Sequence, residues 1–243
     1  IYPAYWWRPN DTPDRIGMSE IRHIEGLYAY WDYLLERFPR LLIDNCAGGG
    51  CRLDLETISR SAPLWRSDHA PGEPEGAQCH AYGINLFLPL NGTGMFSAQP
   101  YEVRSSLSSA VVLGWHALGK ENSVADMRQA MDCFREMRPY YYEDYYPLTG
   151  FGDLTADSVW LAYQLNKPSD GSGVVLAFRR GESPDMTLNV RLEGLDPAAR
   201  YELYDADAHS RQTFTGAALG DGLTLRCETA PGSLLLHYRR IEP

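Results

Sequence analysis

Two different patterns of apolar and polar positions follow each other along the chain. In the first part, apolar side chains recur every three or four residues from 21 to 35, which predicts an amphipathic helix with Ser19 as its N-cap. The runs at 41–43, 62–66 and 84–90 are short and continuously apolar, as in strands of a parallel sheet that is covered on both faces. These runs are therefore interpreted as three buried strands.

More helical segments lie between and after these strands. A short helix is predicted near 53–60, a helix passing into a strand over 103–115, and a further helix where methionines and Phe134 recur between 127 and 137. Helices that alternate with short apolar strands predict βα units and a parallel sheet. The units suffice for about half of an eight-stranded (β/α)8 barrel, which alone usually takes about 250 residues.

The pattern changes near residue 150. Beyond it, apolar and polar residues alternate in short runs that turn residues separate, with no segment of helical spacing. This pattern predicts an antiparallel β-sandwich. We therefore expect residues 1–150 to form a partial (β/α)8 barrel and residues 151–243 to form a C-terminal β-sandwich. The predicted strands are 160–165, 174–178, 187–192, 201–204, 223–227 and 234–238.

Charge and composition exclude several classes of partner. The 243 residues have a formal net charge of -10 and a pI near 5.0, so the surface repels nucleic acid and anionic membranes. Sixteen tyrosines and six tryptophans suit stacking on sugars, with ordinary core packing as the alternative explanation. No apolar run is long enough to span a bilayer.

The cysteines indicate a reduced protein without a metal centre. Five cysteines are an odd number and lack the paired spacing of a disulfide framework or a zinc site, so no metal and no cofactor is predicted. Reduced cysteines weakly favour the cytoplasm. The sequence opens at Ile1 rather than at a methionine, so the lack of a leader does not decide the compartment.

Polar side chains follow two of the predicted strands, where barrel enzymes place their chemistry. Asp44 and Cys46 come directly after residues 41–43 and precede three glycines, and Asp68 follows residues 62–66. Taken separately, Asp44 can be a turn or capping residue, Asp68 an exposed loop acid, and the glycines a tight turn. No Gly-Lys-Ser follows, so a phosphate loop is disfavoured.

Together, the two segments resemble a known pair of motifs. Ile43-Asp-Asn-Cys-Ala-Gly-Gly-Gly-Cys-Arg-Leu-Asp54, followed by Leu64-Trp-Arg-Ser-Asp68, resembles the signature of the α-galactosidases (melibiases) of glycoside hydrolase family 36. In that family a Cys-x-Gly-Gly-Gly-Arg-x-Asp segment leads to a Trp-x-Ser-Asp strand. The resemblance extends over the preceding helix, the Asp144-Tyr-Tyr-Pro-Leu segment and the sandwich, and so covers essentially the whole chain.

The resemblance implies a retaining glycosidase that acts on terminal α-linked galactosides of oligosaccharides. In such enzymes one carboxylate attacks the anomeric carbon and a second acts as acid and then as base. By this resemblance Asp68 matches the acid/base, Cys46 and Gly49 match residues that touch the sugar, and Trp65 supports the wall of the pocket. Asp44 and Arg66 are further substrate-binding candidates, and Arg66 replaces a small polar residue of the family pattern.

Other features depart from the family pattern. The family nucleophile is an aspartate on an earlier strand that has no counterpart here; neither Asp11 nor Asp14 replaces it, so we expect the isolated chain to be an inactive fragment. His69 and His80 in the following loop are either substrate ligands or residues without a role. Two alternatives stay open: a non-catalytic carbohydrate-binding or structural fragment, and α-N-acetylgalactosaminidase specificity. A homo-oligomer is possible by analogy with the family.

Overall fold

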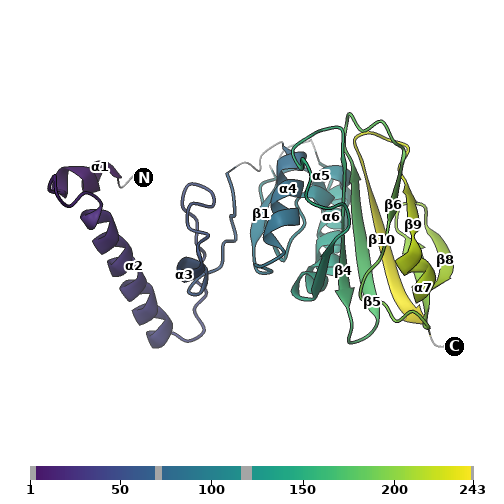
Figure 1. The fold of residues 1–243 in the computed structure, drawn as a ribbon, viewed down its shortest axis with the longest axis horizontal. Coiled ribbons are helices and arrows are strands. Elements are labelled where there is room, and N and C mark those ends of the chain that lie inside the picture. The colour runs from purple at the N-terminus through teal and green to yellow at the C-terminus, as the bar shows by residue number, and fades with distance from the viewer. Residues whose placement is uncertain (1–3, 69–72, 116–121, 242–243) are drawn as a thin grey trace.

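The computed structural model describes residues 4–68, 73–115 and 122–241 (Figure 1). Its N-terminal elements α1, α2 and α3 lie to one side of the remaining elements in this view. The long helix α2 confirms the helix that the spacing predicts, although Trp31 is its only buried residue. These elements are α1 (Ala4–Trp7), the 3-10 helix η1 (Arg8–Asn10), α2 (Met18–Arg37) and α3 (Leu55–Ile58).

The start of α2 differs from the prediction. Its N-cap is Gly17, and Ser19 lies inside the first turn. The carboxylate of Asp11 accepts hydrogen bonds from the backbone N–H groups of Gly17 at 2.7 Å and Ser19 at 2.8 Å, which lowers the pKa of Asp11. An acid from the preceding loop therefore satisfies the first N–H groups of the helix, a role that serine side chains commonly fill.

Four extended segments lie next to one another in chain order. Asp44 and Ala62 form a parallel bridge, residues 62–66 hydrogen-bond to Gly92, and β1 (Gly92–Met95) pairs in parallel with β2 (Ala110–Leu113). The parallel arrangement is as predicted. The bridge between Asp44 and Ala62 is nevertheless an isolated one, and neither 41–43 nor 62–66 is a regular strand.

The predicted strand at 84–90 is wrong. Helix α4 (Pro74–Ile84) ends where this strand should begin, and the turn after it leads to Asn91 at the start of β1. Asn91 therefore directly precedes a strand. Three more helical elements then cover one side of the large sheet, as Figure 1 shows for α5 and α6: α5 (Pro100–Ser105), α6 (Val124–Met137) and the 3-10 helix η2 (Arg138–Tyr142).

The C-terminal part is an antiparallel sheet of six strands in the order β3-β4-β5-β10-β7-β8. The six strands predicted from the sequence are all present, four of them in this sheet and two in a smaller layer. The polar edge strand β8 was not predicted. The first strand, β3, precedes residue 151, so the antiparallel sheet begins earlier than the pattern indicates. The strands are β3 (Asp144–Pro147), β4 (Trp160–Lys167), β5 (Ser172–Arg179), β7 (Arg200–Asp205), β8 (Ser210–Thr215) and β10 (Gly232–Ile241).

A second, smaller layer covers one face of this sheet. It consists of the antiparallel pair β6 (Thr187–Val190) and β9 (Leu223–Arg226) and of helix α7 (Gly216–Asp221). Their apolar side chains share one buried core with those of β4, β5 and β10. Helix α7 contradicts the prediction that this part contains no helix: Thr215 caps it by accepting a hydrogen bond from the N–H of Ala218 at 3.1 Å.

The opposite face of the large sheet packs against the helices. Leu161, Tyr163 and Leu176 belong to a second core that includes residues of α4, α5 and α6. The central strands β4 and β5 are therefore buried on both faces, which explains why apolar residues follow one another along them instead of alternating. The chain is thus of mixed helix and sheet, with the predicted antiparallel sheet in its C-terminal part.

Among the described residues, no helix has both the length and the apolar character that crossing a membrane requires.

Candidate active site

The glycine triplet lies directly against the segment that contains Asp68. Gly49 has φ +55° and Gly50 has φ +90°, in the left-handed region that favours glycine. A β-carbon on Gly49 would lie 2.1 Å from the backbone nitrogen of Asp68, and one on Gly50 would lie 2.5 Å from the carbonyl oxygen of Arg66. The two motifs that the sequence singled out are therefore in contact, and this contact leaves no room for a side chain at either glycine.

Trp65 holds the carboxylate of Asp68. Its indole Nε1–H donates a hydrogen bond of 2.7 Å to Oδ1 of Asp68, and its ring meets Phe96 edge-on with the ring centroids 6.1 Å apart. Trp65 is partly buried and Asp68 is exposed. An indole N–H can only donate, so it orients the carboxyl group and leaves that group open to solvent on the other side. Trp65 thus contacts Asp68 through a hydrogen bond. It does not shield the carboxyl group from water, as aromatic residues do beside some catalytic acids.

The side chain of Asp44, in the first motif, hydrogen-bonds to the backbone of the second motif. Its Oδ1 accepts a hydrogen bond of 3.2 Å from the N–H of Leu64, next to the bridge between Asp44 and Ala62. The neighbouring Asn45 is buried, and its side-chain amide donates to the carbonyl of Arg52 at 2.7 Å. Asn45 therefore closes the glycine loop, a role that the sequence analysis missed although asparagine before such a loop often makes this kind of bond.

Cys46 lines a cavity beside the glycine loop. It is exposed, and the cavity, of about 670 Å³, lies between α2 and the loop and is also lined by Trp7, His23, Tyr28 and Gly48. Neither Trp65 nor Asp68 lines this cavity. The structure thus brings Gly49, Trp65 and Asp68 together, with Asp44 beside them, and Cys46 in the neighbouring cavity.

Arg66, a candidate substrate-binding residue, lies in the interior. Its side chain is buried, with the guanidinium donating to Oδ1 of Asn91 at 2.6 Å and to the carbonyl of Ala77 at 3.1 Å. Burial lowers the pKa of Arg66 to about 10. Successive side chains of an extended segment point to opposite sides, so Arg66 faces inward where Trp65 faces the site. His69 lies outside the described residues, and His80 lies in α4.

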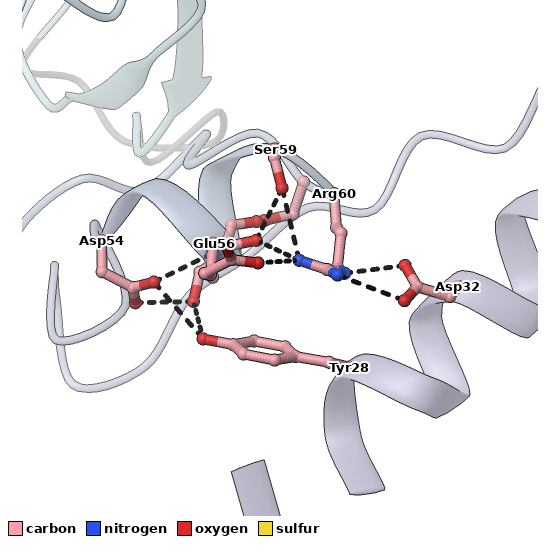
Figure 2. A network of polar contacts seen from close by, with 8 residues as sticks. Tyr28, Asp32, Asp54, Glu56, Ser59 and Arg60 are labelled. Atoms are coloured by element: carbon pink, nitrogen blue, oxygen red, sulfur yellow. Dashed lines mark hydrogen bonds and ion pairs between the residues drawn. The ribbon is translucent and has the colours of Figure 1, made fainter. Parts of the chain in front are cut away.

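A polar network keeps α2 beside the segment that follows the glycine loop (Figure 2). Arg60 donates to Asp32 on α2 at 2.7 Å and to Glu56 at 2.8 Å, and its guanidinium lies 4.7 Å from the ring centroid of Tyr28. The hydroxyl of Tyr28 donates to Asp54 at 3.3 Å, and Asp54 caps α3 through the N–H of Thr57 at 2.9 Å. This network connects the two walls of the cavity that Cys46 lines.

The described residues contain no group of three or more histidine, cysteine, aspartate or glutamate side chains that could hold a metal ion. The arrangement around Asp68 offers an exposed carboxyl group and a donor that orients it. These groups suffice for proton transfer to and from an oxygen atom.

The five thiols differ in exposure, which predicts their reactivity. All are free; Cys46 and Cys51 are exposed, whereas burial raises the pKa of Cys133 to about 11. Because only the thiolate reacts, Cys133 should react more slowly than the exposed thiols. We expect iodoacetamide to label two sites rapidly in the native protein and all five in urea, as measured by mass spectrometry. Replacing Cys46 or Cys51 by serine should each remove one rapid label; equally rapid native labelling of Cys133 would contradict its burial.

Several known proteins are similar to this chain. The melibiase family model matches residues 8–112, which include both motifs. Alpha-galactosidase C of Emericella nidulans is 30% identical over 237 residues, which cover 91% of this chain and 30% of that protein. Residues 8–112 belong to the melibiase family.

Solved structures of this family show the same fold. The glycoside hydrolase family 36 α-galactosidase AgaA of Geobacillus stearothermophilus superposes with a TM-score of 0.75 over 96% of this chain and 33% of its own, at 20% identity. The galactosidase domain of the α-galactosidase-sucrose kinase AgaSK, known in Mediterraneibacter gnavus, gives a TM-score of 0.74 over 93% of this chain and 32% of its own, at 22% identity. The chain spans only part of the length of its curated relatives: 22% of AgaSK, 27% of AgaA and 30% of alpha-galactosidase C.

Proposed function

We propose that this chain is part of a retaining α-galactosidase that removes terminal α-linked galactose from oligosaccharides. In this proposal residues 1–150 form the second half of a (β/α)8 barrel and residues 151–243 form a β-sandwich. Three findings support it: the chain-order arrangement of the extended segments up to β2, the contact between the two family motifs, and relatives that are named α-galactosidases.

In the proposed mechanism Asp68 is the acid/base. Its carboxyl group first protonates the oxygen of the departing sugar, and then, as a carboxylate, takes a proton from the water that attacks the glycosyl-enzyme. The N–H of Trp65 keeps one carboxyl oxygen in place during both steps. Gly49 keeps the loop close enough for a sugar to lie against it, and Cys46 and Asp44 are proposed sugar contacts. The nucleophile comes from residues outside this chain, at roughly 5 Å from Asp68.

One observation matters most for this proposal. The exposed carboxyl group of Asp68 is held by a neighbouring indole N–H and lies against a glycine that has no room for a side chain. A surface acid without a role needs neither constraint. This arrangement favours an enzyme over the structural or purely sugar-binding fragment.

The test is the activity of the full-length protein that contains this chain. We expect turnover of an aryl α-galactoside with release of α-galactose as the first product, followed by proton NMR of the anomeric signal. The same assay with an aryl α-N-acetylgalactosaminide decides between the two sugar specificities. Release of the β-anomer, or no activity on any α-galactoside, would contradict the proposal. The 243-residue chain alone should be inactive.

A further inference from the structure

Helix α4 begins shortly after Asp68 and is fixed from two sides. Its first residue, Pro74, is six positions beyond Asp68 in the sequence. Through Arg66, two residues before Asp68, the helix is hydrogen-bonded to the segment that contains Asp68. Contacts made by α4 consequently affect the acid/base of the proposed mechanism.

From the side of the motif itself, Arg66 holds the helix. Its guanidinium donates to the carbonyl of Ala77 in α4, while its backbone is hydrogen-bonded to Gly92 at 2.9 Å. The same guanidinium donates to Asn91, just before β1. Arg66 thus connects the segment before Asp68 to the helix after it, and closes the base of the loop that contains Asp68.

From the opposite side, Arg180 holds the same helix. Arg180 follows β5 directly and is completely buried. Its Nε donates to Oε1 of Gln78 at 3.1 Å, and one terminal nitrogen lies 3.3 Å from Sγ of Cys79. The other terminal nitrogen donates to the carbonyls of Leu154 and, at 3.0 Å, Ala156. A residue of the large antiparallel sheet therefore binds the helix that follows Asp68.

We infer that Arg180 is a positioning residue for the acid/base Asp68, through which the antiparallel sheet keeps α4 and the Asp68 loop in the productive place. This inference rests on the proposed function. A buried guanidinium is costly to desolvate, and here its donors are used on α4 and on the 154–156 segment. Proton transfer requires hydrogen-bond distance to the departing oxygen, so a small shift of α4 lowers the rate without removing any group that touches the substrate.

The adjacent Arg179 is a matched control. It is also buried and also donates to backbone carbonyls, namely those of Ser183, Cys227 and Glu228 at 3.0 to 3.1 Å. These three partners all belong to the C-terminal part, and none of them lies in α4. Replacing Arg179 therefore removes a similar number of buried hydrogen bonds but leaves the Asp68 loop attached to the sheet.

The experiment compares Arg180→Met, Arg180→Lys and Arg179→Met in the full-length enzyme. Each is assayed on an alkyl α-galactoside, whose leaving oxygen needs a proton, and on a dinitrophenyl α-galactoside, whose leaving oxygen does not. We expect Arg180→Met to lower kcat/KM, which reports the first step, about tenfold more on the alkyl substrate than on the aryl substrate. Arg180→Lys should recover part of this difference, and Arg179→Met should show none.

Equal losses on both substrates in Arg180→Met would overturn the positioning role. If that variant does not fold, Gln78→Leu removes the hydrogen bond between Arg180 Nε and α4 instead. The loss on the alkyl substrate relative to the loss on the aryl substrate then tests the positioning role in the same way. Asp68→Ala is measured in parallel. If it also shows equal losses on both substrates, the proposed function fails; if it discriminates and the Arg180 and Gln78 variants do not, only the positioning role fails.

Discussion

Replacing Asp68 by alanine in the full-length enzyme lowers kcat on an alkyl α-galactoside by a factor of about 100 to 10,000. The expected reason is that the alkoxide leaves only when it is protonated, and Asp68 is the proposed proton donor. The dinitrophenolate group of an activated galactoside leaves without a proton, so the first step on that substrate should be nearly unaffected. Steady-state and burst kinetics on the two substrates measure this difference.

Azide provides the second part of this test. Hydrolysis of the glycosyl-enzyme also needs Asp68, as a base, so the intermediate should accumulate in Asp68→Ala on the activated substrate. Azide attacks without base assistance and should restore turnover with formation of α-galactosyl azide. Asp68→Asn should behave like the alanine variant, because its amide oxygen can still accept the hydrogen bond from Trp65 but the group cannot donate a catalytic proton. Asp157→Ala removes another exposed carboxylate and should change nothing. Equal losses on both substrates without azide rescue would show that Asp68 is not the acid/base.

Replacing Gly49 by alanine should reduce kcat/KM by about 100-fold, because the loop and the Asp68 segment must move apart. The added β-carbon would lie 2.1 Å from the Asp68 nitrogen and 2.8 Å from its Cγ, closer than any stable contact. The nitrogen belongs to the backbone, so the backbone has to shift. Kinetics on the alkyl α-galactoside and thermal unfolding of the same preparations measure both consequences.

Gly48→Ala is the matched control for this variant. Gly48 has φ +49°, close to the +55° of Gly49, but its added β-carbon would meet only Sγ of Cys51, at an ordinary 3.7 Å. The left-handed conformation should cost both variants about 1–2 kcal/mol of unfolding free energy. Only Gly49→Ala should lose activity beyond that. Similar activity of the two variants would show that the contact between Gly49 and Asp68 has no catalytic importance.

Local patterns determined several features correctly. The helical spacing at 21–35 and 127–137 is enough to predict α2 and α6, and α6 has the Ser123 and Asp126 capping box that marks a helix start. The runs after residue 159 predict the strands β4, β5, β6, β7, β9 and β10. The two motifs at a fixed separation identified the glycine loop and the Asp68 segment as candidate site residues. Each of these inferences depends on residues that lie close in sequence or on a complete motif.

Other features depended on distant neighbours. Residues 84–90 have the composition of a buried strand, but the strand that forms is the glycine-rich β1. Gly94 in β1 has no space for a side chain, because Trp65 and Phe96 lie within 3 Å of where its β-carbon would be. The polar sequence of β8 becomes a strand only because β7 offers its free backbone groups. Composition alone cannot reveal either arrangement.

The division between sequence and tertiary structure is clearest at residues 65 and 66. The sequence alone identified the Trp-Arg-Ser-Asp segment and predicted that its acid follows a strand. Only the fold decided that the side chain of Trp65 reaches Asp68, whereas that of Arg66 is buried against Asn91 and Ala77. In an extended segment the two side chains must lie on opposite sides, but which side is the site depends on where α4 and the large sheet pack. That choice depends on residues more than a hundred positions away, such as Arg180, whose partner Gln78 lies 102 positions earlier in the chain.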